Sequence, residues 1–103
     1  IVVYRGGTLP NLFTLAASPS VTLDGGDFGG CGVNAILVRD VEPGTHTVAM
    51  QTDIVAHESV TLAPGQTAYI SCTMLPIGLF LPAPNLTLKQ ASEVPPAIMA
   101  KLS

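Results

Sequence analysis

Two turn signatures, each joined to an alternating run of residues, constrain the fold of this chain more than any other feature. In the first, Val-Thr-Leu at 21–23 leads into Asp-Gly-Gly at 24–26; in the second, Glu-Pro-Gly at 42–44 leads into Thr-His-Thr-Val at 45–48. Gly, Pro and Asp supply the backbone angles that reverse a chain. Alternation of apolar and polar side chains is typical of a half-buried strand. Together the two signatures predict a small antiparallel β-domain.

The rest of the chain continues this pattern of short strands, because nine prolines and ten glycines imply many turns. The glycine-rich stretch 24–32 is interpreted as a turn followed by a close backbone approach. A short helix is expected to open at Pro95-Pro96. Strands are predicted at 1–5, 12–17, 20–24, 33–41, 45–52, 56–63 and 67–74, with edge strands at 79–81 and 86–89. This spacing favours one all-β domain over 1–103, an antiparallel β-sandwich of about seven to eight strands with a short C-terminal helical segment.

Charge is scarce, at 11% of residues and a net charge of −3. Only four cations are present and they are dispersed, so we expect no nucleic-acid partner and no electrostatic docking on anionic lipid. The longest apolar stretch, 74–82, is about half the length that a helix needs to cross a bilayer. We therefore expect membrane contact only through a lipid anchor upstream of Ile1.

The two cysteines, Cys31 and Cys72, both point toward the core by strand parity. In an oxidising compartment we expect a disulfide between them, which in the chain-entropy model stabilises by about 4 kcal/mol for a loop of about 40 residues. The alternative is a pair of buried free thiols in a cytosolic protein. Because the pair lacks CxxC spacing, neither metal ligation nor redox chemistry is expected.

Neither histidine has an evident catalytic partner. His46 follows a Pro-Gly turn on the inward face of its strand. A general base would need a carboxylate or a nucleophile beside it, so we interpret His46 as packed near a sheet end with one ring nitrogen bonded to a turn carbonyl. His57 is expected to face solvent. The chain also lacks a nucleophile elbow, a P-loop and a complete calcium loop, so we predict no enzyme activity, metal or cofactor.

Segment 74–84 is the best candidate for an interaction surface, because it carries no polar side chain. If exposed, it would form a larger apolar patch than monomers usually tolerate. The alternative is that it wraps the sheet edge and completes the core. Its large apolar members, taken as the candidate surface, are Leu75, Ile77, Leu79, Phe80 and Leu81.

Motifs from nearly the whole chain together carry a resemblance to a known family. They are Tyr-Arg at 4–5, Val-Thr-Leu-Asp-Gly at 21–25, Glu-Pro-Gly-Thr-His-Thr-Val at 42–48, the strand after a Pro-Gly turn at 64–70, and the closing strand and helix at 86–88 and 97–102. This order resembles a family of bacterial envelope lipoprotein domains of unknown function, similar to PEGA-type sandwiches. In those domains a V-x-L-D-G strand pairs with a P-G-x-H-x-V strand. The resemblance implies an exported domain, periplasmic or anchored to the outer membrane, and brings no catalytic residues.

Three classes of function are compatible with these features. The first is a non-enzymatic envelope domain, structural or binding another envelope protein through a sheet edge or the apolar segment. The second is a small-ligand or glycan binding module built from the loops at 24–32 and 40–44. The third, a hydrolase or metalloenzyme, would require a pocket with a perturbed titratable group. The oligomeric state is not predicted.

Overall fold

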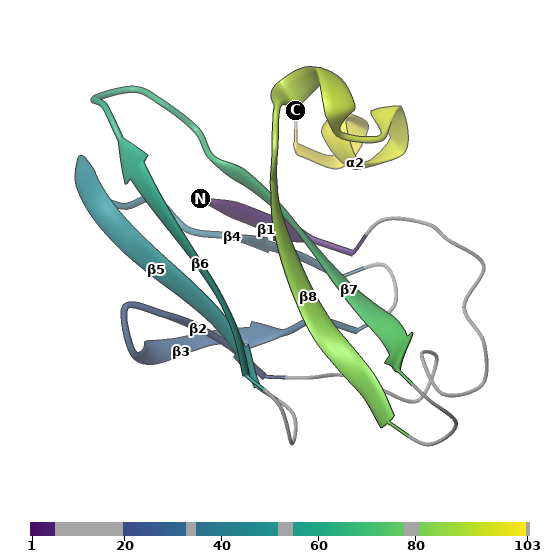
Figure 1. Cartoon of the computed structure of the whole chain (residues 1–103). Coiled ribbons are helices and arrows are strands. Elements are labelled where there is room, and N and C mark those ends of the chain that lie inside the picture. Colours follow the sequence, from purple (N-terminus) through teal and green to yellow (C-terminus); the bar gives the residue numbers. More distant parts are fainter. Residues whose placement is uncertain (6–19, 33–34, 52–54, 78–80, 103) are drawn as a thin grey trace.

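The chain folds into two β-sheets of four strands each, followed by a short helical segment (Figure 1). The computed structural model describes residues 1–5, 20–32, 35–51, 55–77 and 81–102, with the backbone alone for 73–77 and 81–84. The predicted all-β class is confirmed. The strand expected at 12–17 lies outside the described residues.

The first sheet has the strand order β4-β1-β7-β8. Its strands are β1 (Val2–Tyr4), β4 (Ile36–Val38), β7 (Tyr69–Ile77) and β8 (Leu81–Lys89). Strand β1 lies antiparallel to β4 but parallel to β7, with Val3 opposite Ile70. The expectation of a purely antiparallel fold is therefore wrong at this pair. The alternation of apolar and polar side chains along a strand indicates which face is buried, but it does not indicate whether the adjacent strand runs parallel or antiparallel.

The second sheet has the strand order β3-β2-β5-β6 and is antiparallel throughout. Its strands are β2 (Ser20–Leu23), β3 (Gly26–Gly30), β5 (Gly44–Gln51) and β6 (Val55–Leu62). Strands β2 and β5, which carry the two motifs of the opening signatures, lie side by side with Leu23 opposite Val48. The pairing expected of these two motifs is thus present.

Residues 26–30 form a strand, where the sequence was interpreted as a turn or hairpin tip followed by a close backbone approach. The turn itself is confined to Asp24 and Gly25, which have positive φ angles of 51° and 83°, and such angles match a tight hairpin connection. Glycine is a poor strand former, but hydrogen bonding to β2 supports β3 and Phe28 anchors it in the core. The close approach occurs at Gly29, where an added Cβ would lie 2.7 Å from Leu37 Cδ2.

One hydrophobic core draws side chains from both sheets. Four of its large side chains, Val21, Val48, Met50 and Ile70, have no exposed surface. Val60 and Leu62 of β6 also point inward. The other members are Ile1, Val3, Leu23, Phe28, Cys31, Ala68, Cys72 and Leu86. The two sheets are therefore held against one another by shared apolar burial.

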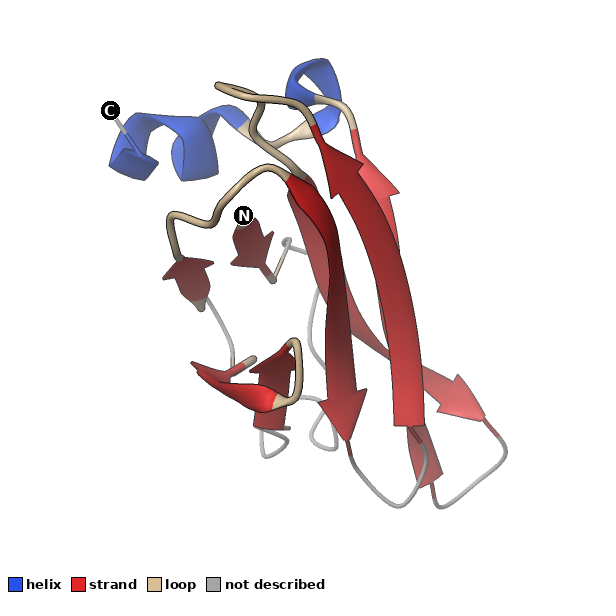
Figure 2. Cartoon of the chain, turned by 90° about the vertical axis from the view of Figure 1, so that its left-hand side faces the viewer, coloured by secondary structure: helices blue, strands red, loops and turns tan. Residues whose placement is uncertain are grey.

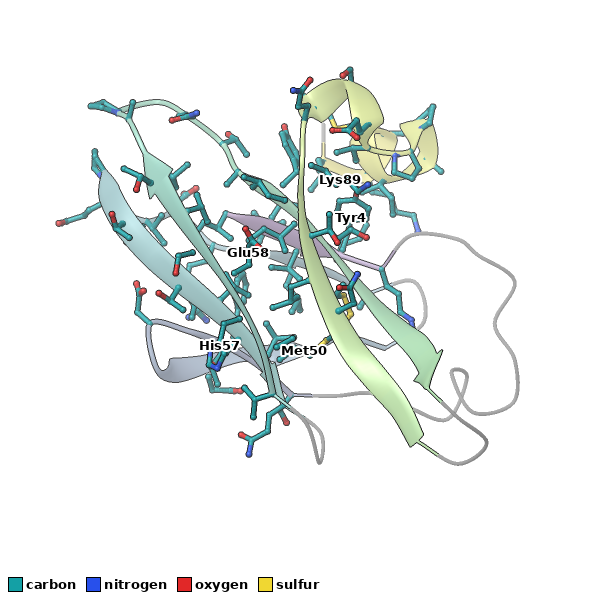
Figure 3. The ribbon with its side chains drawn as sticks, viewed as in Figure 1. Tyr4, Met50, His57, Glu58 and Lys89 are labelled. Atoms are coloured by element: carbon teal, nitrogen blue, oxygen red, sulfur yellow. A yellow bond between two sulfur atoms is a disulfide. The ribbon has the colours of Figure 1, made fainter. Side chains whose placement is uncertain are left out.

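A second, smaller cluster covers the outer face of the first sheet. The 3-10 helix η1 (Ala91–Glu93) and the α-helix α2 (Pro96–Leu102) follow β8 and lie beside that sheet (Figures 1 and 2). Val94 and Ile98 form a buried cluster with Tyr4 of β1. Met99 and Leu102 pack against this cluster. Figure 3 shows Tyr4 beneath this segment and Met50 between the sheets. The expected C-terminal helix is confirmed, including its apolar face.

Candidate functional site

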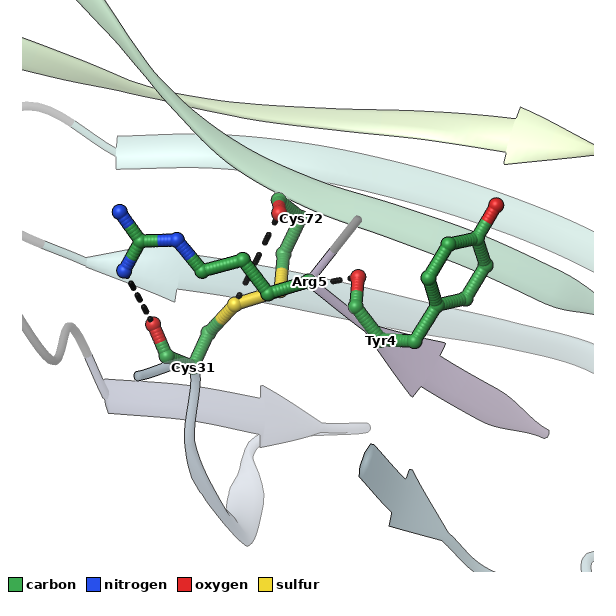
Figure 4. The surroundings of a disulfide bond; sticks show 4 residues. All are labelled: Tyr4, Arg5, Cys31 and Cys72. Carbon is green, nitrogen blue, oxygen red and sulfur yellow. Dashed lines mark hydrogen bonds between the residues drawn. A yellow bond between two sulfur atoms is a disulfide. The ribbon is translucent and has the colours of Figure 1, made fainter. Parts of the chain in front are cut away.

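The predicted disulfide between Cys31 and Cys72 is present, and it connects the two sheets (Figure 4). Cys31 directly follows β3, Cys72 lies in β7, and their Cα atoms are 6.6 Å apart. Both residues are essentially inaccessible, at 1% and 0% exposure. A bond so far from solvent is suited to holding the fold together, since a reactive cystine would have to be reached by a thiolate.

Polar groups of β1 surround the disulfide. Arg5 is 8% exposed, and its Nη1 donates a 3.2 Å hydrogen bond to the carbonyl oxygen of Cys31. The carbonyl oxygen of Tyr4 lies 3.3 Å from Cys72 Sγ (Figure 4). Burial lowers the pKa of the Arg5 guanidinium, and burial raises the pKa of the Tyr4 phenol, which a hydrogen bond with Ser71 partly opposes. These contacts connect Tyr4 and Arg5, near the start of the chain, to both cysteines.

A second polar arrangement joins the two turn signatures through His46. Its Nδ1 lies 2.6 Å from Asp24 Oδ2, and its Nε2 lies 2.6 Å from the carbonyl oxygen of Glu42. The other carboxylate oxygen of Asp24 accepts a 2.8 Å hydrogen bond from the Thr47 amide, while the Asp24 amide donates to the Thr47 carbonyl. The predicted bond from His46 to a turn carbonyl is confirmed, but the carboxylate partner was missed.

This arrangement favours a charged pair. The hydrogen bond to Asp24, followed by the one to the Glu42 carbonyl, raises the pKa of His46. The hydrogen bond from His46, followed by the one from the Thr47 amide, lowers the pKa of Asp24. Because both neighbours of the ring are acceptors, only the doubly protonated imidazolium can donate to each of them. The contacts satisfy every hydrogen-bonding nitrogen of His46, so the ring acts as a clasp between two turns.

The remaining predicted site residues are dispersed. His57 is exposed, as predicted, and lies opposite Ala49, whereas His46 lies opposite Val60 on the same pair of strands. Of the two loops predicted to bind a small ligand, 24–32 is partly strand, because 26–30 is β3, whereas in 40–44 only Gly44 belongs to a strand, β5. Among the described residues, no group of three or more His, Cys, Asp or Glu side chains could hold a metal ion.

The predicted apolar surface falls mostly outside what the structure describes. Leu75 and Ile77 belong to β7 and Leu81 to β8, where the backbone alone is described, and Leu79 and Phe80 lie beyond the described residues. Strand β1 pairs only with 69–71 of β7, so the β7–β8 hairpin continues past the end of β1. That these apolar residues form an interaction surface therefore remains a prediction.

A hollow lies between β6 of one sheet and β8 of the other, where sequence reasoning placed no site. It has a volume of about 580 Å³ and is open on one side. Val60, Leu62 and Ala68 supply its buried residues, while Leu88 lines it with 48% of its surface exposed. Exposed polar side chains of Thr61, Gln66, Thr67 and Gln90 also line it. We call this hollow the β6–β8 groove.

The orientation of Leu88 explains how the groove arises. Leu88 is the direct cross-strand partner of Ile70, which is fully buried in the core. Directly opposed residues share a face of the sheet, so Leu88 also belongs to the inner face. An inner-face leucine with half of its surface in solvent marks the place where the two sheets separate. Strand parity predicts the orientation, but the exposure depends on the spacing of two distant strand edges.

No family model, curated protein or solved structure matches this chain. Within the described part, no helix is long and apolar enough to cross a membrane. The features of the molecule that bear on its function are the disulfide, the His46 clasp and the β6–β8 groove.

Proposed function

We propose that this chain is a non-enzymatic, exported β-sandwich domain of the bacterial cell envelope, periplasmic or tethered to the outer membrane through an upstream lipid anchor, which binds another envelope protein. The buried disulfide between Cys31 and Cys72 is the observation that carries the proposal. Disulfides form and persist in oxidising compartments such as the periplasm, and they are rare in the cytosol. This one joins the two sheets inside the core and is therefore part of the fold.

The PEGA-like resemblance supports the same assignment. The V-x-L-D-G motif lies on β2 and the P-G-x-H-x-V motif on β5, and the two strands pair in register. Asp24 of the first motif and His46 of the second are bonded to each other. The most distinctive residues of the two motifs thus have a shared structural role, as is expected of a non-catalytic domain.

Binding suits the accessible features better than catalysis does. The Asp24–His46 pair resembles a base with its orienting carboxylate, but His46 Nε2 is already occupied by the Glu42 carbonyl and is 2.6 Å from it. A general base needs that nitrogen free to reach a nucleophile or a substrate proton. The open β6–β8 groove, with apolar and hydrogen-bonding residues together, is suited to recognition of a partner.

Cell fractionation combined with thiol labelling tests the proposal. The gene, with its own upstream region, is expressed in a bacterial host, and the fractions are treated under denaturing conditions with a maleimide reagent that adds mass. We expect the protein in the envelope fraction, with Cys31 and Cys72 labelled only after reduction. A Cys31→Ala control leaves Cys72 unpaired and should be labelled without reduction. A cytoplasmic protein with two reactive thiols would refute the proposal.

A further inference from the structure

We propose that the β6–β8 groove binds an extended peptide segment, which adds to the free edge of β6 and carries a basic residue two positions away from an apolar residue. This inference rests on the proposed function, because it assigns the site and the class of partner to an interaction domain. Recognition by strand addition uses the backbone for affinity and alternate side chains for specificity.

Of the four edge strands, β6 is the least protected against the addition of another strand. β4 has only three residues, and β3 contains three glycines and a register shift against β2. β8 includes Pro82 and Pro84, which cannot donate a backbone hydrogen bond. β6 extends over eight residues without proline, glycine or lysine, and among the described strands it pairs with β5 alone. Short length, proline, bulges, lysine and inward-pointing charges are the usual protections of an edge, and of these β6 has only one inward-pointing charge, that of Glu58.

The lining of the groove calls for an apolar side chain from the partner. Val60 and Leu62 point into it from β6, and Leu88 faces them from the inner side of the other sheet. The exposed half of Leu88 is apolar surface that a partner side chain would remove from water. A segment added beside β6 would place every second side chain on this inner face.

The charges beside the groove favour a basic residue in the partner. Glu58 lies two residues before Val60 and therefore on the same, inner face of β6, where it is partly buried. Among the described residues no hydrogen bond or ion pair engages its carboxylate. Glu58 lies next to the lining residues Ser59 and Val60 and is not itself one of them. Lys89 and Glu93 do line the groove, but they pair with each other at 3.9 Å and together add no net charge. Within the described part of the chain, Glu58 is thus a carboxylate without a cationic partner.

These two positions define a pattern. Residues facing Glu58 and Val60 across a strand pair are separated by two positions along the added strand. The partner segment therefore has the pattern basic-x-apolar when it runs in one direction along β6 and apolar-x-basic in the other. The peptide acetyl-TVTKTVT-amide satisfies both directions, and acetyl-TVTETVT-amide has the same apolar residues with the charge reversed.

Nuclear magnetic resonance titration of the ¹⁵N-labelled, disulfide-bonded protein with these two peptides tests the inference. We expect the lysine peptide to shift amide resonances of β6 and of the end of β8. The glutamate peptide is expected to bind about tenfold more weakly, because a favourable cross-strand charge pair becomes a repulsive one. In the Glu58→Lys variant this preference should be inverted.

A matched variant separates the local charge from the overall charge. Asp27→Lys makes the same change of charge on β3, the opposite edge of the same sheet. It should retain the preference for the lysine peptide. Equal binding of both peptides, or an equal effect of Asp27→Lys and Glu58→Lys, would overturn the inference. So would the absence of any shift at millimolar peptide, or concentration-dependent β6 shifts without peptide, which would identify a second copy of this chain as the occupant.

The outcome is independent of the cellular test of the proposed function. An oxidised envelope protein that ignores both peptides would retain its proposed location and lose this binding site. A reduced cytoplasmic protein that discriminates between the peptides would retain the site and lose the proposed location.

Discussion

The two sheets are joined in different ways at their two sides. On the β3 side, Cys31 is covalently bonded to Cys72 of the other sheet and both residues are buried. On the β6 side, the inner-face residue Leu88 remains 48% exposed and the β6–β8 groove opens between the sheets. Because the disulfide holds the two sheets together on one side, they can remain apart on the other. We expect stability to reside on the first side and recognition on the second.

Removing the cross-link should have the largest effect on stability. The Cys31→Ala, Cys72→Ala double variant releases a closed loop with a sequence separation of 41. We expect a loss of about 4 kcal/mol in the free energy of unfolding, measured by urea denaturation at neutral pH. The wild-type protein with its disulfide reduced serves as a control and should lose a similar amount. A loss below about 1 kcal/mol would contradict a structural role of the bond.

A pair of truncations compares the closed core with the open side directly. Ile70 and Leu88 are cross-strand partners on one face, but Ile70 is fully buried whereas Leu88 is half exposed. Ile70→Ala should cost about 3 kcal/mol, because it removes buried apolar surface and leaves a cavity. Leu88→Ala should cost about 1 kcal/mol, because solvent already reaches the side chain. Equal losses in denaturant unfolding would mean that the β6–β8 groove is closed in solution.

The smallest effect is expected from the clasp at His46, which lies outside both regions of the comparison. Since its pKa is raised in the folded protein, its contribution is complete below the unfolded pKa of about 6.5. That contribution is lost as pH rises through the folded pKa. The lowered pKa of Asp24 acts in the opposite direction: its contribution is present above about pH 3.9 and is lost as pH falls through the folded value.

Proton resonances of the His46 ring, followed against pH, provide the measurement. Asp24→Asn should lower the His46 pKa, because the carboxylate that favours the imidazolium is removed. It should also weaken the pH dependence of stability in the range where His46 titrates. A matched Asp27→Asn variant removes a carboxylate from the same hairpin without touching His46 and should leave the titration unchanged. An unaltered His46 titration in Asp24→Asn would argue against the clasp in solution.

The sequence predicted those features of the fold that depend on residues close together in the chain, such as turns and the buried face of a strand. The motifs at 21–25 and 42–48 predicted two strands, the family resemblance implied that these strands pair, and parity placed Cys72 inside. The strand β3 was missed because glycine is usually excluded from strands, and here hydrogen bonding to β2 and the burial of Phe28 override that preference. The parallel partner of β1 was missed because direction is set by tertiary contacts 67 positions apart, from Val2 to Tyr69.

The site was less predictable for a related reason. Asp24 and His46 were each recognised, but their contact depends on the register that places Leu23 opposite Val48. The signal was available, since both residues lie at the same ends of two strands expected to pair. The β6–β8 groove had no comparable signal, because an exposed inner face depends on how far two sheet edges diverge.

The parallel contact between β1 and β7 also constrains the order in which the molecule is assembled. Among the described residues, Val2, Val3 and Tyr4 alone connect β4 to β7 in their sheet. The ribosome therefore releases this first strand long before its central neighbour exists, and contacts of such long range form slowly. The β2–β3 and β5–β6 hairpins can form early from neighbouring segments, whereas the first sheet must wait for β7 and β8. The first sheet is therefore completed only after the strands of the second have been synthesised.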